Sequence, residues 1–486
     1  MNLLLILPLV VTMFFGLVSY FGKYTKKTND ILFILTTSIV FVLVVGFLFI
    51  PFEGNLVLFK ITNDLVVSFK IDGISKIFST IISLIWLIVS IFSIKYMECE
   101  ERENKFYAWN LMTLGMMITL SYASNLLTMY LFFEMVTLMS MPLVMHSKSK
   151  ESKQAALKYL FYSLGGAFLG LIAVVSGILY STNGGEFVLG GSLDVLSGGQ
   201  ETFALVALLC GLIGFGAKCG AFPLQAWLPS AHPVAPSPAS ALLSGMITKA
   251  GVIAIIRLIF FSYGPKFMEG TYVQYTWEVL LIITILLGST LALLQNTFKR
   301  RLAYSSISQL SYILLGLCTL TEAGFVGSIL HVLSHAFIKV GLFLVAGVLI
   351  YKYHIHNVDE MEGIGKKAPI TMWCYTLLSL ALVGVPPTGA FISKWFLATG
   401  SIESNMVFFN YFGAVVLLIS AILTAVYLLQ VSIKAFFPKE KKEEKKDHES
   451  LLMVIPLILL VIGVFAVGIF SGFISDYVIS LIGGLF

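Results

Sequence analysis

Charged side chains are scarce in this chain: they make up 12% of its 486 residues, while 58% of the residues are hydrophobic. An ordinary soluble domain carries about 25% charged residues. With a mean hydropathy of +0.93, the composition predicts a polytopic membrane protein that is surrounded by lipid bilayer. The net charge of +5 is small, so we expect no nucleic acid among its partners.

Cysteine is also scarce, and its spacing excludes the usual cofactor sites. None of the five cysteines forms a C-x-x-C pair, and four lie in apolar segments. We therefore expect no disulfide, zinc site or iron–sulfur cluster, no metal and no cofactor in this chain. If the protein works with a redox enzyme, the redox centres belong to other chains. The cysteines are Cys99, Cys210, Cys219, Cys318 and Cys374.

Long apolar runs dominate what is present. The first, residues 3–20, lacks a basic segment before it and a small-residue cleavage site after it, so it predicts a membrane helix rather than a removed signal peptide. Segments of about twenty apolar residues are long enough to cross a bilayer. Fourteen spans are predicted, at about 2–21, 30–50, 74–94, 107–123, 125–146, 155–180, 203–228, 238–262, 275–295, 303–319, 324–350, 369–399, 408–436 and 451–484.

The basic residues orient these spans. Counted loop by loop, the odd-numbered loops hold 20 Lys and Arg, whereas the even-numbered loops hold only Lys60, Lys70 and Lys266. By the positive-inside rule the odd loops are cytoplasmic, which predicts a multi-pass cell-membrane protein with both termini extracytoplasmic. Residues 51–72 alternate apolar and polar and predict an extracytoplasmic hairpin. The mixed charges of residues 437–450 predict a solvated cytoplasmic loop.

Prolines interrupt two of the spans. Phe222-Pro223 and Leu228-Pro229 break the seventh, and residues 385–389 break the twelfth. Broken helices in corresponding positions of two units are typical of transporters with internal repeats. The predicted fold is all-α, with about 14 transmembrane helices and two inverted five-helix repeats that each contain a broken helix. Its parts are 1–106 (helices 1–3), 107–262 (first repeat), 275–436 (second repeat), the loop 437–450 and the last helix, 451–486.

Five charges fall deep inside predicted spans, and a charge at the centre of a membrane helix costs at least about 2.5–3.5 kcal/mol. Such groups must pair, line a hydrated cavity or exchange protons. Glu134 is the only carboxylate that we place well inside a span, so lysines outnumber acids, and this favours protons over sodium as the transported ion. The five are Glu134, Lys218, Lys249, Lys339 and Lys394.

Lys218 immediately precedes the first break, and Lys394 follows the second. Burial disfavours a charged amine and a nearby carboxylate favours it. Approach and separation of Lys218 and Glu134 would therefore load and eject a proton. The alternative is a static ion pair that holds two helices together.

Lys249 lies about ten residues from either end of its span, roughly 15 Å at 1.5 Å per residue, which is too far to reach the interface by snorkelling. His331, His335 and Lys339 recur every four residues and share one stripe of the eleventh span. Imidazoles that donate and accept suit a proton wire. A metal site at the two histidines is the competing interpretation, but no carboxylate or cysteine stands nearby.

His232 follows the first break, where it either gates proton uptake or caps a turn. Gly165-Gly166 and Gly214-x-Gly216 lie in apolar helices without the strand that a nucleotide loop requires, so we interpret them as close helix packing.

Together these motifs resemble the antiporter-like subunits shared by respiratory complex I, membrane-bound energy-converting hydrogenases and multisubunit Mrp-type cation/proton antiporters. The resemblance covers nearly the whole chain. It is carried by residues 71–75, 126–134, 158–159, 217–232, 240–245, Lys249, 299–306, 331–339 and 386–394.

The resemblance implies roles for the interior charges. Glu134 and Lys218 match the family's paired switch, and Lys249, His331, His335 and Lys339 match its central hydrophilic axis. Lys394 matches its terminal lysine, where some complex I members carry glutamate. The chain also ends without the lateral helix of the most distal complex I subunit, which favours the other complex I subunits, the hydrogenase homologues and the D-type Mrp subunit.

The implied partners are other membrane subunits, including homologous antiporter-like ones, and a peripheral iron–sulfur, hydrogenase or dehydrogenase arm. The expected function is proton translocation coupled to electron transfer, without a redox centre in this chain. A subunit of a redox-free Na⁺/H⁺ antiporter is the alternative. An inert spacer, whose charges only orient helices, is a third.

Overall fold

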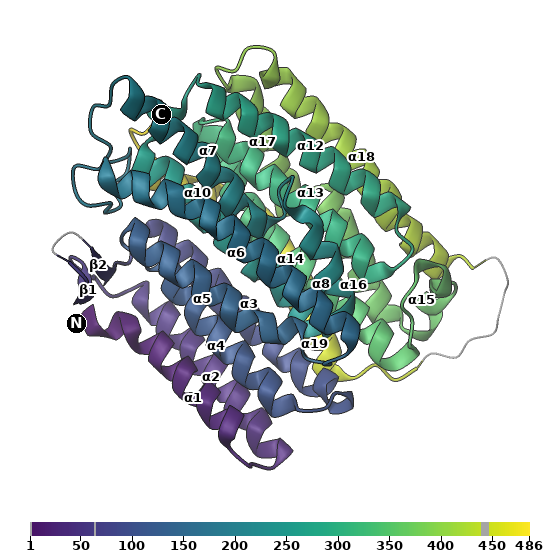
Figure 1. Ribbon diagram of the computed structural model, residues 1–486. Helices are drawn as coiled ribbons and strands as arrows, with labels where there is room; N and C mark the ends of the chain where they lie inside the picture. Colours follow the sequence, from purple (N-terminus) through teal and green to yellow (C-terminus); the bar gives the residue numbers. More distant parts are fainter. Residues whose placement is uncertain (1, 63–64, 439–446) are drawn as a thin grey trace.

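The computed structural model describes residues 2–62, 65–438 and 447–486. This part of the chain is a bundle of long helices that run roughly alongside one another, with one small hairpin at its end (Figure 1). The helices before the first break are α1 Leu7–Phe21, α2 Lys26–Phe47, α3 Gly73–Tyr96, α4 Glu103–Ser121, α5 Leu126–Val144, α6 Lys150–Leu179 and α7 Gly199–Cys219.

The next span, Ser237–Tyr263, mixes helix types: α9 Ser237–Leu242 and α10 Lys249–Ile256 alternate with the π-helical segments Leu243–Ile247 and Arg257–Tyr263. The remaining helices are α8 Leu228–Val234, α11 Pro265–Met268, α12 Tyr272–Leu294, α13 Phe298–Cys318, α14 Glu322–Tyr353, α15 Ile364–Lys367, α16 Pro369–Val383, α17 Gly389–Glu403, α18 Phe409–Phe436, α19 Leu451–Ile469 and α20 Ser471–Ile482. Short 3-10 turns cover Asn2–Ile6, Met97–Cys99, Gln225–Trp227 and Val358–Met361.

Within the described residues, 11 helices are long and apolar enough to cross a membrane. The more polar helices α4 and α13 and the broken pair α16–α17 add three further passes, which gives the fourteen that the sequence predicts. The last predicted span is not one helix: α19 ends at Ile469 and α20 starts at Ser471. The fold is therefore the all-α polytopic fold expected from the apolar runs.

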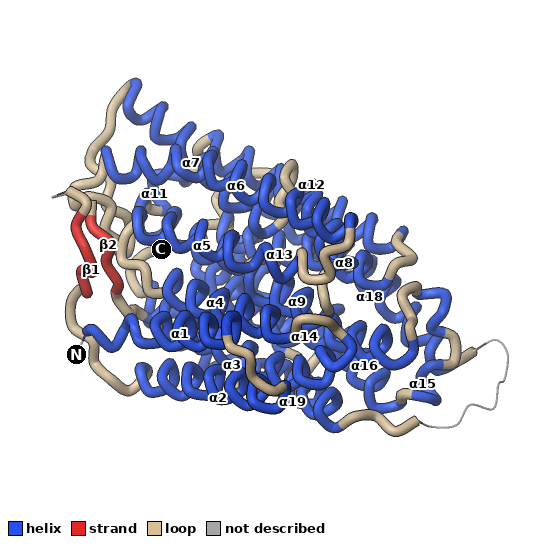
Figure 2. Tube along the Cα trace, turned by 60° about the horizontal axis from the view of Figure 1, so that its bottom comes forward, coloured by secondary structure: helices blue, strands red, loops and turns tan. Residues whose placement is uncertain are grey.

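Both termini and the hairpin lie at the same end of the bundle (Figures 1 and 2). Strands β1 Leu56–Lys60 and β2 Val66–Phe69 pair antiparallel, as predicted for residues 51–72. Asn2 Nδ2 donates to Glu53 O at 2.8 Å, and the ring of Phe486 lies 5.9 Å from that of Phe260 at the end of its span. We call this the terminal end, and the opposite end, which carries α15, the basic end.

The first break is shorter than predicted. Helix α7 stops at Cys219, where Gly220 adopts φ +75°, and α8 already begins at Leu228. Pro229 falls in the first turn of α8, where a missing N–H removes no helical hydrogen bond, so it starts a helix instead of interrupting one. The indole of Trp227 donates to Ala217 O at 2.8 Å and so satisfies a carbonyl at the end of α7.

The second break separates α16 from α17 at Gly384–Thr388. Lys394 Nζ donates to the carbonyls of Leu382 (2.6 Å) and Val383 (2.9 Å), the last two residues of α16. A helix C-terminus carries partial negative charge and free carbonyls, so it stabilises this ammonium. In each five-helix unit, α4 to Tyr263 and α12 to α18, the broken helix is the fourth.

Of two further expectations, the structure confirms one and contradicts the other. A Cβ on Gly166 would lie 2.6 Å from Gly214 O, so these glycines do allow α6 and α7 to pack closely, as predicted. Lys299 and Arg301, however, are not loop residues. They lie in the first turn of α13 and are only 5% and 4% exposed, because Lys299 Nζ donates to Ala235 O (2.6 Å) and Arg301 Nη1 to Tyr427 O (2.9 Å).

Candidate functional site

Lys218 lies in the last turn of α7 and is 1% exposed. Its ammonium donates to Thr137 Oγ1 (2.6 Å) and Tyr159 Oη (2.7 Å), and the Tyr159 hydroxyl lies 2.7 Å from Ser140 Oγ. Thr137 and Ser140 belong to α5, the helix that carries Glu134. The amine is thus held by hydroxyl groups that can accept or pass on a proton.

Glu134 is half-buried on the outer side of α5, next to Met135, which is 39% exposed. Its Oε2 is buried and has no hydrogen-bond partner among the described residues. No ion pair of 4.0 Å or less joins Glu134 to Lys218 in the part of the chain that the structure describes. Glu134 and Lys218 are therefore separated in this structure. The interpretation as a static ion pair that holds two helices together does not fit this arrangement.

The helices of Lys218 and Lys249 approach each other closely. Cys219 Sγ donates to Thr248 O at 3.3 Å, and a Cβ on Gly251 would lie 2.7 Å from the same sulfur. Only a glycine allows α10 to come this near to α7. The two lysines thus lie on facing helices, each adjacent in sequence to one residue of this contact.

Lys249 is fully buried and does not snorkel. Its Nζ lies 2.7 Å from His335 Nδ1 and donates to Ser244 O at 2.9 Å. Ser244 belongs to the π-helical segment Leu243–Ile247, and His335 to α14. This contact joins the first unit to the second at mid-span.

The predicted stripe on α14 is continuous and buried. The His331 and His335 rings are 6.0 Å apart, and Lys339 Nζ donates to Ser305 Oγ at 2.7 Å. His331 Nδ1 lies 2.9 Å from the hydroxyl of Ser393, the residue before Lys394. The stripe therefore connects Lys249 to the second broken helix. No group of three or more His, Cys, Asp or Glu residues that could hold a metal occurs among the described residues.

Lys394 ends this row of groups. Its side chain is half-buried, and the neighbouring Trp395 is 67% exposed on the outside of the bundle. We call this series of groups the row. It begins at Glu134 and ends at Lys394, which are both half-buried, and its inner members are Lys218, Lys249 and the α14 stripe (His331, His335 and Lys339).

His232 lies in α8 and is fully buried, with its ring stacked 4.6 Å from that of Phe343. Neither ring nitrogen has a hydrogen-bond partner in the described structure. The turn-capping interpretation is therefore wrong, because a cap requires such a bond. The position inside the protein is compatible with proton uptake through α8.

One buried acid was missed from the sequence. Glu278 lies in the second turn of α12 and is 3% exposed, so Glu134 is not the only interior carboxylate. The predicted span 275–295 already contained this residue. In the structure the end of α13 and the start of α18 lie beside it.

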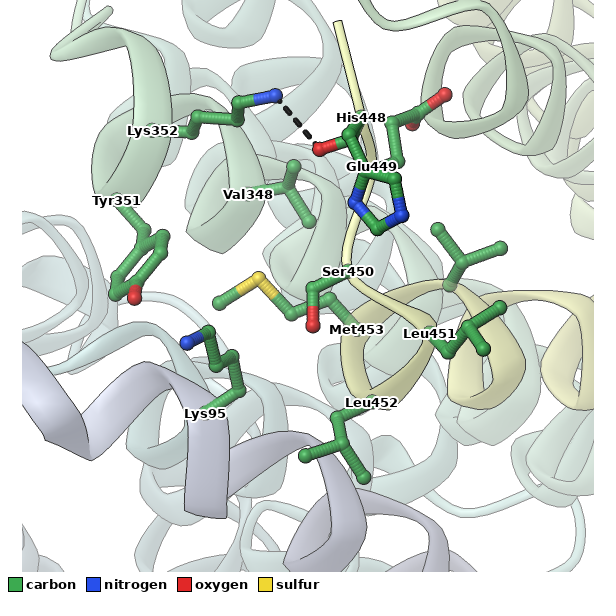
Figure 3. Close-up of a pocket in the computed structure, with 11 residues that line it drawn as sticks. Lys95, Val348, Tyr351, Lys352, His448, Glu449, Ser450, Leu451, Leu452 and Met453 are labelled. Carbon is green, nitrogen blue, oxygen red and sulfur yellow. Dashed lines mark hydrogen bonds between the residues drawn. The ribbon is translucent and has the colours of Figure 1, made fainter.

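A pocket of about 450 Å³ opens at the basic end (Figure 3). The Lys352 side chain lines this pocket, and its Nζ donates to His448 O at 2.9 Å. None of the row residues lines it, so this pocket is separate from the candidate site. Its lining is Lys95, Val348, Tyr351, Lys352 and residues 448–454.

Two five-helix units with matching broken helices, joined by a buried row of lysines and histidines, define an antiporter-like membrane subunit. Residues 123–424 match the family described as "NADH:quinone oxidoreductase/Mrp antiporter, TM", and the chain belongs to this family. Residues 59–107 also match "NADH-Ubiquinone oxidoreductase (complex I), chain 5 N-terminus".

Similar curated proteins come from redox complexes and from an antiporter. NADH-quinone oxidoreductase subunit N of Desulforudis audaxviator is 31% identical over 396 residues, 78% of this chain and 77% of that protein. F(420)H(2) dehydrogenase subunit N of Methanosarcina mazei is 29% identical (84% and 83% covered). The D-type subunit of the Na(+)/H(+) antiporter of Bacillus subtilis is 28% identical (82% and 79% covered).

Solved structures share the fold over the whole chain. The Mrp complex from Dietzia sp. DQ12-45-1b contains a chain with a TM-score of 0.86 and 19% identity, which covers 99% of this chain and 98% of that one. Respiratory complex I from Thermus thermophilus contains one with a TM-score of 0.82 and 23% identity, at 99% and 100% coverage.

Proposed function

We propose that this chain translocates protons across the cell membrane as a subunit of a membrane-bound redox complex. The observation that carries the proposal is the hydrogen bond between Lys249 of the first unit and His335 of the second. It makes one row of proton-binding groups out of two otherwise separate halves. Intramembrane ionisable residues of this kind are costly and mark ion pathways.

The row supports a stepwise transfer. Protons are taken up from the cytoplasm through α8, near His232 and Lys218. They pass along Lys249, His335 and His331, and are released near Lys394. Movement of Glu134 toward or away from Lys218 changes how well the buried ammonium is stabilised, and so loads or ejects a proton.

In this proposal the basic end faces the cytoplasm and both termini are extracytoplasmic, because the basic residues gather in the loops at the basic end. The energy comes from electron transfer in other subunits, since this chain is expected to hold no redox centre. Its neighbours are homologous antiporter-like subunits and a peripheral hydrogenase or dehydrogenase arm, as the names of its relatives suggest.

Lys218→Ala in the assembled complex tests the proposal. Proton uptake into membrane vesicles and electron transfer are measured together, with Lys352→Ala as the control, because Lys352 is a lysine at the basic end outside the row. We expect Lys218→Ala to lose most proton translocation per electron and the control to keep it. Normal stoichiometry in Lys218→Ala would refute the assignment.

The second candidate is a subunit of a redox-free Na⁺/H⁺ antiporter, favoured by the relative in Bacillus subtilis and by the high TM-score of the Dietzia chain. The proteins that copurify with this chain separate the two candidates. An iron–sulfur or hydrogenase arm supports the redox complex, whereas several small membrane subunits without such an arm support the antiporter.

A further inference from the structure

Among the described residues, Glu278 is a buried acid that the row described above does not use. It lies at the terminal end of the second unit, where the start of α12 meets the end of α13 and the α17–α18 connection. Gln274, one turn earlier on α12, donates through Nε2 to Cys318 O, the last residue of α13 (2.8 Å). Glu278 therefore points into the junction between these helices.

Gly413 of α18 lies beside this acid and allows α18 to pack closely on α17. A Cβ on Gly413 would lie 3.4 Å from Glu278 Oε1 and would collide with Ser401 Oγ. No lysine, arginine or histidine of the described residues lies within ion-pair distance of Glu278. An unpaired buried carboxylate is costly when charged, so its environment favours the protonated form.

A stripe of buried residues on α18, three of which carry hydroxyls, leads away from this junction. Gly413, Leu417, Ser420, Thr424 and Tyr427 are spaced by four, three, four and three residues and are all buried. This spacing places them on one stripe of the helix. The stripe faces α12 and α13 and runs from Glu278 toward the middle of the bundle.

The inner end of the stripe contacts the row directly. Tyr427 Oη donates to Ser305 Oγ at 2.7 Å, and Ser305 Oγ accepts from Lys339 Nζ, also at 2.7 Å. Tyr427 Oη is in addition 3.1 Å from Thr424 Oγ1. A lysine of the central row thus shares a hydroxyl with Tyr427, the innermost member of the stripe.

Hydroxyls from three helices continue it outward. Ser420 Oγ lies 2.5 Å from Ser289 Oγ on α12 and 3.0 Å from Ser308 Oγ on α13. One turn farther out, Tyr312 Oη donates to Leu417 O at 3.1 Å, and Lys394 Nζ lies 5.4 Å from the Tyr312 ring. Lys339 is therefore joined to the stripe through hydrogen bonds, whereas Lys394 lies over the ring of a tyrosine that donates to it.

From Leu417 to Gly413 is four residues, about 6 Å along the helix. Residues 414–416 of α18 carry no hydroxyl, so the last step to Glu278 requires water in this segment. We propose that Glu278 is a proton-binding site at the terminal end of the second unit, which receives protons from Lys339 along the α18 stripe and releases them to the extracytoplasmic side. The step moves a proton between oxygen and nitrogen atoms, and no bond between heavy atoms changes.

This proposal rests on proton translocation by the chain, so its test needs a readout that is independent of turnover. Infrared spectra of the assembled complex at neutral pH should contain the carbonyl band of a protonated carboxylic acid that is lost in Glu278→Gln and kept in Glu269→Gln. Glu269 is a matched control because it is exposed at the same end of the bundle. Identical carbonyl bands in all three proteins would overturn the proposal.

Transport is then compared in two variants that each lose one buried hydroxyl next to α18. Tyr427→Phe cuts the stripe, whereas Tyr375→Phe removes a hydroxyl that donates to Leu428 O at 3.0 Å, off the stripe. We expect proton translocation per electron to fall in Tyr427→Phe, because only this hydroxyl joins Lys339 to the stripe through Ser305, and to stay normal in Tyr375→Phe. Equal effects in the two variants would refute the stripe.

Glu278→Gln completes the comparison with Lys218→Ala. Loss of translocation in both variants, in complexes that assemble and transfer electrons, supports both proposals. Loss in Lys218→Ala with normal translocation in Glu278→Gln overturns only the role of Glu278. Where Glu278→Gln does not assemble, Tyr427→Phe and Tyr375→Phe decide the question alone.

Discussion

Lys249 Nζ and His335 Nδ1 lie 2.7 Å apart, and no acid of the described residues forms an ion pair with either group to balance a second positive charge. The pair therefore accommodates one proton comfortably and two at a high electrostatic cost. A proton that arrives from one five-helix unit must be passed on to the other before the next can arrive. This contact therefore sets the order in which protons move along the row.

His335→Gln tests that order. Glutamine keeps a polar side chain but does not take up a proton as imidazole does. A positioned proton-transfer group typically contributes about 10²–10⁴-fold in rate, so we expect most of the proton translocation per electron to be lost. Proton uptake by vesicles is the measurement, and His356→Gln, at an exposed histidine, is the control. Unchanged translocation in His335→Gln would remove this histidine from the pathway.

Tyr159→Phe tests how the Lys218 ammonium is held. The variant removes one of its two hydroxyl acceptors. Because a buried hydrogen bond to a charged group contributes about 1.5–3 kcal/mol, we expect a clear loss of thermal stability in detergent. Tyr375→Phe, which loses a bond to a neutral carbonyl, should lose less. Equal losses would mean that the Lys218 amine is uncharged in the resting protein.

Asp72 at the start of α3 predicts a pH-dependent contribution to stability. Burial alone would raise the pKa of its carboxyl, but Arg257, with Nη1 2.5 Å from Oδ2, and Ser75 outweigh it and lower the pKa from 3.8 to about 2. The ion pair therefore stabilises the fold above pH 3.8, by about 2 kcal/mol, and this is lost as pH falls toward 2.

The measurement is the difference in thermal stability between the natural protein and Asp72→Asn in detergent. We expect a constant difference from pH 8 to about pH 5 and a shrinking one at lower pH. A difference that grows on acidification would contradict the assignment. Glu53→Gln, an exposed acid at the same end, serves as the control.

Gly214→Ala tests the contact between α6 and α7. A Cβ there would lie 2.6 Å from Gly170 N and collide with Gly166 O, so we expect a loss of about 1–3 kcal/mol from overpacking. Gly165→Ala is the matched control, because no atom lies within 4 Å of its new Cβ. Thermal unfolding in detergent measures both, and equal stability would show that the helices separate without cost.

The sequence predicts the helices and the α14 stripe well because apolar runs and a four-residue spacing are local signals. It predicts contacts between helices poorly. Nothing in the sequence around Lys249 indicates that its partner is His335. The sequence also predicts Lys299 to be a loop residue, whereas in the structure it donates to the carbonyl of Ala235 inside the bundle. Glu278 was missed for the same reason, since its burial comes from α13 and α18.

One end of the row has a consequence for assembly. Glu134 is half-buried near the outer surface, and its Oε2 has no hydrogen-bond partner among the described residues. A charged group inside a membrane span costs about 2.5–3.5 kcal/mol. In the proposed complex, a neighbouring subunit that presents a lysine to Glu134 relieves this cost, so docking of the neighbour and ionisation of Glu134 favour each other.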